Sequence, residues 1–345
     1  MAVRRLREIP GFNIDRVAAA AGDDPGVLRM ENLDTDVPPP AAALEATRAA
    51  VGEDDANSWL PFNGREDLKE AVSEYVRRRG GPAYDPRREI VITCGEGEAM
   101  LDALLCLTDP GVEVQPPLAV ADRTRVVFVN NASFPTGWVA SDDEWEAIAR
   151  LCAERDLWLL YWGGFEGVLY DGRAVRQPAA LPGMRDRTVT VGAPSMEQRM
   201  IAWRVGWIVM PADLTDAVSR AQIYNGLVAS GFAQIGTREA LRVGDDDLRA
   251  ANAEWQRRRD ETLRQLDGLP VVRPSGGWAA LLDVAALGFD CADASARLLE
   301  HGVAATHMRG WGGEVADRHV RFVFSNEPVE RIALLGDRVR AALGR

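Results

Sequence analysis

The sequence predicts an α/β protein in which a large domain with a mainly parallel sheet is followed by a smaller α+β domain. Strands of the buried type alternate with amphipathic helices from about residue 89 to residue 210, which is typical of a parallel sheet covered by helices. The pattern changes after Leu214, where a long helix and short strands follow. The length of 345 residues also suggests two domains.

The elements of the large domain follow in order from their periodicity. The proline-rich segment 37–40 ends an irregular N-terminal arm, and a helix is expected over 41–51. Apolar residues at helical spacing predict a second helix over 66–79. Strands are predicted over 89–93, 125–130, 157–162, 188–191 and 205–210. Two more helices are predicted over 97–107 and 142–155, and Ser141 is the expected N-terminal cap of the second.

The part after the large domain is typical of a smaller α+β domain. A long helix is predicted over 247–266 and a last helix over 329–343, with short strands near Val271 and over 279–283 and 319–324. We therefore expect three parts: an N-terminal arm over 1–40 that completes the small domain, a large domain over 41–230, and a small domain over 231–345.

Composition and charge argue against several classes of protein. The net charge of −12 would repel a phosphate backbone, so nucleic acid is not expected as a partner. No apolar run approaches the roughly 20 residues that span a bilayer, and residues 1–16 lack the apolar core of a secretory signal. The four cysteines form no CxxC pair, which favours reduced thiols and a cytoplasmic protein. The three histidines lack metal-binding spacing, so no metal is expected.

Several segments in order along the chain resemble one protein family. The clearest is Asn130-Asn-Ala-Ser-Phe-Pro-Thr-Gly137, which resembles the signature Asn-Asn-Pro-x-Asn-Pro-Thr-Gly. The other segments are residues 59–68, 93–99 with 109–111, 162–171, 196–207 and 319–322. Together they resemble the fold type I (class I/II) pyridoxal-phosphate-dependent aminotransferases over most of the chain. The resemblance implies an aminotransferase-like α/β fold with a mainly parallel large domain, a smaller C-terminal domain and a homodimer.

The residue that the family uses for covalent catalysis is absent from its expected place. Counting back eight residues from Arg204 reaches Met196, where the family has the lysine that bonds the cofactor aldehyde and moves the α-proton. A thioether can do neither. The chain contains one lysine, Lys69, and the helical pattern puts it on the polar face of the helix over 66–79. We therefore expect Lys69 to be a solvated surface residue.

The resemblance also implies that the contacts to the cofactor are lost. Trp162 stands at the position of the aspartate that pairs with the pyridine nitrogen, and Phe134 and Phe165 replace an asparagine and a tyrosine that contact the ring. Glu96 and Glu98 bring negative charge to the turn that normally holds the phosphate.

Two further differences affect the cofactor site. Trp59 replaces a tyrosine that usually reaches the neighbouring subunit's phosphate, and Arg204 alone remains of the family's cofactor set. The chain is also shortened between residues 114 and 125, where the family usually supplies the aromatic residue stacked on the ring. We expect Trp162 and Phe134 to fill the vacated volume and no cofactor to bind, so Met196 leaves a degenerate site.

Two arginines remain as candidate anion-binding residues. Arg321 matches the family's substrate carboxylate clamp, and a planar guanidinium binds a carboxylate through two hydrogen bonds. The alternative is a structural salt bridge at a strand end. Arg204 could bind an anion in the place of the phosphate, although an ion pair with Glu96 or Glu98 is the favoured alternative.

The candidates for acid–base chemistry are His307 and Asp36. His307 and Arg309 lie in a loop that lines the substrate side in the family, where an imidazole could act as a general base. The alternative for His307 is a loop histidine without a task. Asp36 lies near a family glycine that closes over the substrate, so its carboxylate could meet a substrate amine, or it could be a surface turn residue.

Asn130, Asn131 and Trp162 are candidate ligand contacts at the end of strands. Ligands of α/β proteins bind at the carboxyl edge of the sheet, which favours a role for both asparagines in binding. They could equally cap the following turn. Trp162 could form part of a stacking wall, whereas core packing is the commoner role of such a residue.

These observations predict a pyridoxal-phosphate-independent enzyme on an aminotransferase scaffold. We expect a cytoplasmic homodimer without cofactor that binds a small amino-acid-like or keto-acid-like carboxylate, and neither membrane nor nucleic acid. Acid–base groups alone could run a cyclisation, dehydration or isomerisation in specialised biosynthesis. The alternatives are a non-catalytic partner or regulatory protein and, least favoured by the sequence, a true aminotransferase.

Overall fold

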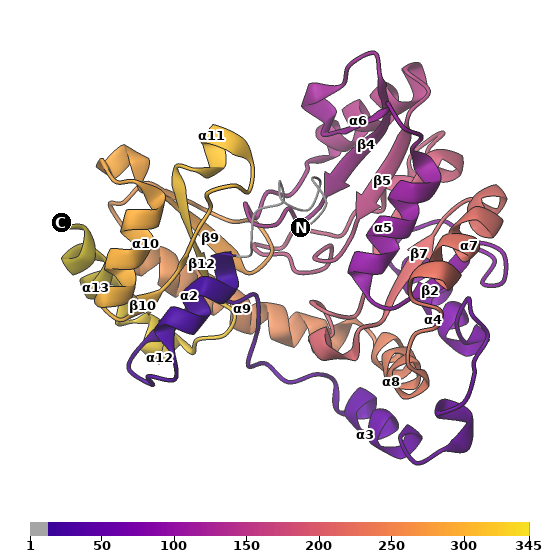
Figure 1. The fold of residues 1–345 in the computed structure, drawn as a ribbon, viewed down its shortest axis with the longest axis horizontal. Coiled ribbons are helices and arrows are strands. Elements are labelled where there is room, and N and C mark those ends of the chain that lie inside the picture. The colour runs from indigo at the N-terminus through magenta and orange to yellow at the C-terminus, as the bar shows by residue number, and fades with distance from the viewer. Residues whose placement is uncertain (1–12, 345) are drawn as a thin grey trace, which may run out of the picture. The chain divides into compact units, whose positions relative to one another are not determined.

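The computed structural model describes residues 13–344, which divide into two compact units (Figure 1). Unit 1 contains the described residues up to Val37, together with Phe134–Gly137 and the described residues from Ala251 onwards. Unit 2 contains Pro38–Ser133 and Trp138–Ala250. The first twelve residues of the predicted N-terminal arm lie outside the described residues, as does residue 345.

A six-stranded sheet forms the centre of unit 2. Its strands lie in the order β2–β7–β6–β5–β4–β3, and β7 is antiparallel to both of its neighbours while the others run parallel to one another. The strands are β2 (Ile90–Thr93), β3 (Glu113–Gln115), β4 (Thr124–Asn130), β5 (Trp158–Trp162), β6 (Thr188–Gly192) and β7 (Gly206–Val209). The predicted mainly parallel sheet is confirmed.

Helices cover both faces of this sheet. The apolar sides of α4 and α6 pack on one face, and those of α5 and α7 pack on the other (Figure 1). The helices of unit 2 are α3 (Ala41–Ala50), α4 (Glu66–Arg78), α5 (Glu96–Leu107), α6 (Asp142–Glu154), α7 (Thr215–Asn225) and α8 (Gly231–Arg242). The helix α9 (Asp245–Gln265) begins in unit 2 and continues into unit 1.

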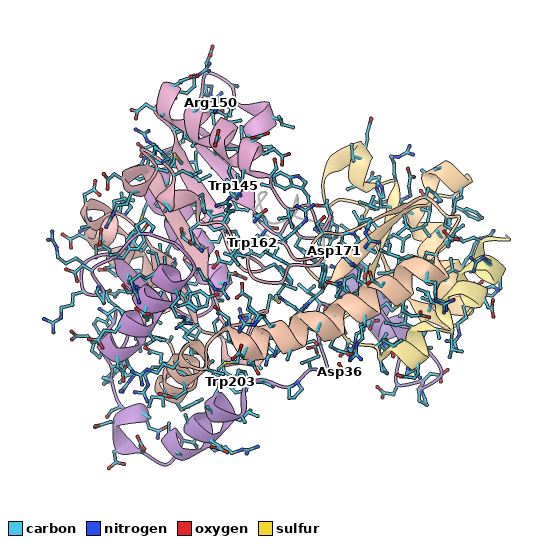
Figure 2. All side chains as sticks on the ribbon, turned by 180° about the vertical axis from the view of Figure 1, so that it is seen from behind. Asp36, Trp145, Arg150, Trp162, Asp171 and Trp203 are labelled. Atoms are coloured by element: carbon cyan, nitrogen blue, oxygen red, sulfur yellow. The ribbon has the colours of Figure 1, made fainter. Side chains whose placement is uncertain are left out.

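The start of α6 shows how the local sequence determines a helix boundary. The Ser141 hydroxyl accepts a hydrogen bond from the N–H of Glu144, and the Glu144 carboxylate accepts one from the N–H of Ser141. This reciprocal capping satisfies two N–H groups that the helix cannot. Trp145 then points to the sheet, where its ring packs edge-on against Tyr161, while Arg150 points to solvent (Figure 2).

Unit 1 is built on short strands and helices around a four-stranded antiparallel sheet. That sheet has the order β11–β12–β9–β8, and a separate parallel pair joins β1 to β10. The strands are β1 (Leu28–Arg29), β8 (Val271–Val272), β9 (Ala279–Asp283), β10 (Val303–Ala304), β11 (Thr306–His307) and β12 (His319–Val323). The helices are α2 (Asn13–Ala21), α10 (Cys291–Glu300), α11 (Gly313–Ala316), α12 (Val329–Ile332) and α13 (Leu335–Leu343).

Two sequence predictions about unit 1 are wrong. The N-terminal arm is not irregular throughout, because Ile14, Val17 and Ala21 repeat at helical spacing and form the buried side of α2. The predicted last helix is two helices, α12 and α13, interrupted at residues 333–334. Among residues 13–344, none of the helices has both the length and the hydropathy needed to span a membrane.

Candidate functional site

The carboxyl edge of the sheet in unit 2 carries most of the predicted site residues. β4 ends at Asn130, β5 at Trp162 and β6 at Gly192, and the turn after β2 leads directly into α5. Gly95 is the residue before α5 and has a φ of 89°, a left-handed conformation that favours glycine. This edge is where parallel α/β sheets bind ligands.

The space above the end of β5 contains a carboxyl group and an indole. A side-chain carbon added at Gly164 would lie 2.4 Å from Glu96 Oε1 and 2.8 Å from Trp162 Nε1, so both groups crowd the same glycine. Neither atom has a hydrogen-bond partner of normal geometry among residues 13–344. Burial raises the pKa of Glu96 to about 7. This part of the sheet edge is therefore closed by Glu96 and Trp162.

Arg204 does not pair with the nearby carboxylates. It is exposed, has a φ of 52°, and lies across the turn before α5, with its Nη1 donating to the carbonyl of Ile201 at 3.1 Å. In the part of the chain that the structure describes, it forms no ion pair with Glu96 or Glu98. Glu98 instead accepts a hydrogen bond from the N–H of Cys94. Arg204 thus remains a candidate contact for an anion.

The segment that contains Met196 is fixed by its neighbour. Met196 itself is partly exposed, whereas Glu197 is fully buried and accepts hydrogen bonds from the Tyr75 hydroxyl and the N–H of Gly167. Arg79 forms an ion pair with the same carboxylate. Residue 196 is therefore held at the sheet edge by a network of buried polar contacts.

The prediction that Lys69 is a solvated surface residue is wrong. Its side chain is buried, and burial lowers its pKa. The charges that act on it belong to Glu66, Asp85 and Arg87, and the last two lie in the turn immediately before β2. Lys69 therefore lies towards the amino end of β2, whereas Met196 follows the carboxyl end of β6, at the opposite edge of the sheet.

Asn130 and Asn131 bond to the protein's own backbone. Asn130 Nδ2 donates to the carbonyl of Trp162 at 3.2 Å, and Asn131 Oδ1 accepts from the N–H of Ala140 at 2.8 Å. The hydroxyl of Tyr161 donates to the carbonyl of Asn131 at 3.3 Å. These contacts join the ends of β4 and β5 and stabilise the loop that leads to α6.

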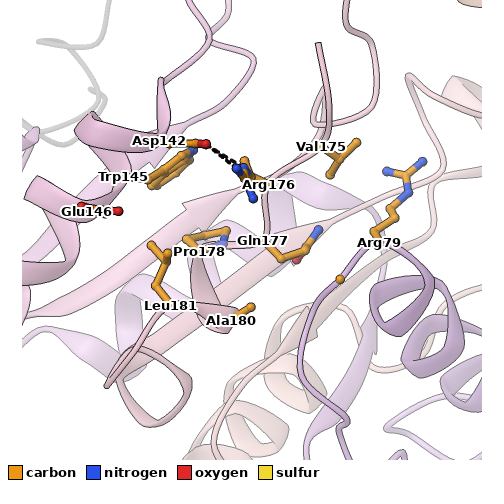
Figure 3. Close-up of a pocket in the computed structure, with 11 residues that line it drawn as sticks. Arg79, Asp142, Trp145, Glu146, Val175, Arg176, Gln177, Pro178, Ala180 and Leu181 are labelled. Atoms are coloured by element: carbon orange, nitrogen blue, oxygen red, sulfur yellow. Dashed lines mark hydrogen bonds and ion pairs between the residues drawn. The ribbon is translucent and has the colours of Figure 1, made fainter. Parts of the chain in front are cut away.

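A cavity of about 270 Å³ lies beside α6 in unit 2 (Figure 3). Its lining includes Arg79, Trp145 and Gln177, and an ion pair between Arg176 and Asp142 lies at its rim. None of the candidate residues from the sequence lines it. The cavity is distinct from the sheet edge at Glu96 and Trp162.

Arg321 is the most buried candidate residue of unit 1. It lies on β12 opposite Thr306 of β11, and its guanidinium lies 5.2 Å from the centre of each of two rings, those of Phe134 and Trp311. Its Nη2 donates to the carbonyl of Glu31, while Nε and Nη1 have no acceptor among the described residues. Two N–H groups of a fully buried guanidinium thus remain available for an acceptor.

His307 and Arg309 follow Thr306 along the chain, and His307 pairs with Val320 of β12, so its side chain lies on the face of the sheet opposite to that of Arg321. His307 Nδ1 lies 3.4 Å from Asn13 Nδ2, and burial together with the charge of Arg309 lowers the pKa of His307. Arg309 forms an ion pair with Asp290, the residue that caps α10. His307 is therefore neutral near pH 7 and able to accept a proton, whereas Arg309 is engaged in a structural contact.

Asp36 is held by an arginine of α9. Its Oδ1 lies 2.6 Å from Arg258 Nη1, and Arg258 also binds Glu254 at 2.7 Å. About half of the Asp36 side chain is exposed (Figure 2). This carboxylate stabilises unit 1 and already has a cationic partner.

Comparison with known proteins identifies the family to which this fold belongs. Residues 115–334 match the family described as aminotransferase class I and II. The chain belongs to the class I and II aminotransferase family. The N-succinyldiaminopimelate aminotransferase of Mycobacterium tuberculosis has a similar structure, with a TM-score of 0.91 and 26% identity over 99% of this chain and 100% of that one. The predicted aminotransferase-like fold is thereby confirmed.

Curated relatives extend the similarity to nearly the whole chain. The arginine–pyruvate transaminase AruH of Pseudomonas aeruginosa is 28% identical over 91% of this chain and 90% of its own. The aspartate/prephenate aminotransferase of Thermus thermophilus is 28% identical over 98% of this chain and 94% of its own.

These relatives contradict the function expected from the sequence. The expectation of a pyridoxal-phosphate-independent cyclase, dehydratase or isomerase on a degenerate site does not agree with aminotransferases that match along nearly the full chain. That expectation rested on single positions, Met196 above all, while the overall similarity favours the family's own activity.

Sequence reasoning missed the buried network around Glu197. Arg79 binds Glu166 at 3.0 Å as well as Glu197, and the Tyr161 hydroxyl, which also faces the carbonyl of Asn131, lies 3.2 Å from Glu166 Oε2. Burial raises the pKa of Glu166 to about 7, although Arg79 opposes the rise. The one signal in the sequence was a pair of glutamates within otherwise apolar segments after β5 and β6.

Proposed function

We propose that the chain is an aminotransferase acting on a small amino acid and a small 2-oxo acid. The relatives that match nearly its whole length carry this activity in their names, which supports the reaction class. Arg321 supports the substrate class, because a fully buried guanidinium with two N–H groups lacking acceptors suits a carboxylate.

Arg321 is the residue that we propose as the carboxylate anchor. The rings of Phe134 and Trp311 lie next to each other, 6.0 Å apart, and each centre is 5.2 Å from the guanidinium, so both contribute to its apolar surroundings. The buried carboxylate of Glu31 acts on Arg321 from nearby but forms its ion pair with Arg29, so the guanidinium lacks a carboxylate of its own, a buried state that costs several kcal/mol. His307 has a lowered pKa and remains a candidate proton acceptor of unit 1, although the strand register places it on the other face of the sheet from Arg321.

The residues at the sheet edge of unit 2 do not fit pyridoxal phosphate in the manner of the family. The fold family implies that group, which needs an amine at residue 196, an acid near the ring nitrogen and room for a phosphate at the start of α5. Here Met196 offers no amine, and Glu96 and Trp162 crowd the glycine at the end of β5. No step through the cofactor is therefore derived.

We further propose that this member of the family lacks the Schiff-base lysine. Met196 stands eight residues before Arg204, and Lys69 is buried towards the opposite edge of the sheet. Mass spectrometry after incubation with pyridoxal phosphate and borohydride should find no adduct on residue 196 and should find one in Met196→Lys. An adduct on Lys69 that accompanies activity would contradict the proposal.

The activity is tested by direct measurement of amino-group transfer. Purified protein would be assayed with and without added pyridoxal phosphate against a panel of amino acids with pyruvate or 2-oxoglutarate, and the baseline for each condition is the same mixture without protein. We expect transfer above the baseline that Arg321→Met reduces at least tenfold. If the natural chain shows no transfer above the baseline while Met196→Lys does, the proposed activity is wrong. The proposal that the chain lacks the Schiff-base lysine is then unaffected.

Three further expectations remain part of this proposal. We propose a homodimer, a cytoplasmic location and a division into arm, large domain and small domain. The exposed, edge-on aromatic pair of Trp59 and Phe62 supports a surface that a second copy covers. Sedimentation of the natural chain and of Trp59→Ser tests the dimer, since the variant should shift to monomer.

A further inference from the structure

The C-terminal end of α7 meets two carboxylates of α5 in unit 2. Asp102 is fully buried, and its Oδ1 accepts a hydrogen bond from Asn225 Nδ2 at 2.5 Å. The Glu98 carboxylate lies against Gly226, where an added side-chain carbon would stand 2.0 Å from Oε1. Because Gly226 caps α7, both carboxylates lie at the negative end of that helix.

Oxygen atoms that can only accept hydrogen bonds gather at this helix end. Glu98 Oε1, Asp102 Oδ2 and Gln222 Oε1 are buried and have no partner within residues 13–344. Gln222 is itself fully buried, and its Nε2 donates to the carbonyl of Leu227 at 3.0 Å. Its amide therefore lies beside the Gly226 that Glu98 contacts. Buried acceptors normally have partners, so three without donors favour a bound group in this region.

The surrounding charges do not supply a cation. The groups that act on Asp102 are its own burial, Asn225 and the negative charge of Glu98, and no basic side chain is among them. Neither carboxylate forms an ion pair among residues 13–344, because the hydrogen-bond partners of Glu98 and Asp102 are the N–H of Cys94 and the amide of Asn225. Two carboxylates and a helix C-terminus then attract positive charge to one place.

We propose that Glu98, Asp102 and Gln222 form a binding site for a hard divalent cation of the calcium class between α5 and α7. Carboxylate and amide oxygens are the ligands that Ca²⁺ prefers, and carbonyls of the last turn of α7 with water complete its roughly six to eight positions. Two carboxylates balance its charge. No group of three or more His, Cys, Asp or Glu side chains is arranged for a metal in the described part of the chain, and this site needs only two.

The site is independent of the proposed activity, since none of its residues belongs to the candidate substrate contacts. Glu98 and Leu227 are partly exposed, which leaves an ion a way in from solvent. The alternative to an ion is a proton shared in a hydrogen bond between the two carboxyl groups, which would leave no site for Ca²⁺.

Calorimetry with Ca²⁺ decides between ion and proton. The full chain, treated with chelator and then dialysed at pH 7.5, should bind one Ca²⁺, and Asp102→Asn should weaken binding at least tenfold. Asp109→Asn removes the same charge at an exposed position after α5 and should leave the affinity within twofold. Glu98→Gln provides a second variant if Asp102→Asn does not fold. Absence of heat with Ca²⁺, equal affinity in both asparagine variants, or binding of K⁺ alone would overturn the proposal.

Discussion

The guanidinium of Arg79 binds Glu197, with 2.5 Å between Nη2 and Oε2, and Glu197 is the residue that follows Met196. The same arginine binds Glu166 through Nη1 at 3.0 Å. Glu166 lies in the segment after β5 and Glu197 in the segment after β6, so one side chain at the end of α4 holds both strand-end segments. The ring of Tyr75 lies under the guanidinium, 4.1 Å from its carbon.

Replacing Arg79 by methionine should destabilise unit 2 strongly. The substitution leaves two buried carboxylates without their cation, which costs about 3–5 kcal/mol in comparable buried pairs. Urea unfolding followed by tryptophan fluorescence measures the loss in the free energy of unfolding. Arg77→Met is the matched control, because Arg77 pairs with Glu74 on the exposed side of the same helix and its replacement should change stability far less. Equal losses in the two variants would contradict the assigned role.

The helix that ends at Arg79 shows how far sequence reasoning reaches. Periodicity predicted its apolar face correctly, since Leu68, Val72 and Tyr75 are all buried. It failed at Lys69, whose side chain is buried although the helical pattern put it on the polar face. A helical pattern reports which side faces the sheet, while the burial of one long side chain depends on segments distant in the chain.

Adding a methyl group at Gly164 should disturb the closed end of β5. The new carbon would lie 2.4 Å from Glu96 Oε1 and 2.8 Å from Trp162 Nε1, so the side chains must shift, at a cost of about 1–3 kcal/mol. Gly97→Ala is the control on α5, where an added carbon meets nothing within 4 Å. That variant should gain about 0.5–1 kcal/mol from helix propensity. Unfolding curves in which Gly164→Ala is neutral would show that the end of β5 is open.

The carboxyl group of Glu96 should make stability depend on pH. Its pKa is raised from 4.5 to about 7 in the folded chain, so the folded state holds the proton more tightly than the unfolded state. The stabilisation is therefore fully present below about pH 4.5 and is lost as the pH rises through about 7. Glu96→Gln should stabilise the chain at pH 8 by up to about 3 kcal/mol, and by much less at pH 5.

The effect of Glu96→Gln is the difference in the free energy of unfolding between this variant and the natural chain, measured at each pH. This comparison cancels the contribution of Glu166, which also titrates near pH 7. Glu146→Gln, at an exposed position of α6, serves as the control and should show no difference between pH 5 and pH 8. A gain from Glu96→Gln that is the same at both pH values would mean that Glu96 is charged throughout.

Arg321 and Asp36 show why sequence positions alone could not define the site. The strand position of Arg321 could be predicted, but its lack of an acceptor could not, because its surroundings come from β11 and from residues near 31 and 134. Asp36 meets Arg258, which lies 222 residues further along the chain. A carboxylate that looks free in the sequence can thus be neutralised by a contact that only the fold creates.

Arg321→Met should raise the stability of the unliganded chain while removing carboxylate binding. Burial lowers the pKa of Arg321 to about 10, which remains well above neutral pH, so the side chain is charged in both folded and unfolded states. The folded state therefore bears the cost of the buried charge at every pH below about 10. The hydrogen bond to the carbonyl of Glu31, the charge of the Glu31 carboxylate and the two neighbouring rings offset part of that cost.

Methionine keeps the bulk of Arg321 and removes the charge. The carboxylate of Glu31 keeps its ion pair with Arg29 when Arg321 is replaced, and the charge removed is one whose Nε and Nη1 lack acceptors among the described residues, so we expect Arg321→Met to stabilise the chain without ligand. Arg318→Met is the control, because Arg318 forms a partly exposed pair with Asp283 and should change stability by less than about 1 kcal/mol. Adding 2-oxoglutarate should raise the midpoint of thermal unfolding in the natural chain and in Arg318→Met, but not in Arg321→Met. If Arg321→Met unfolds at a lower temperature than the natural chain and still responds to 2-oxoglutarate, then Arg321 is a structural residue and the carboxylate binds elsewhere.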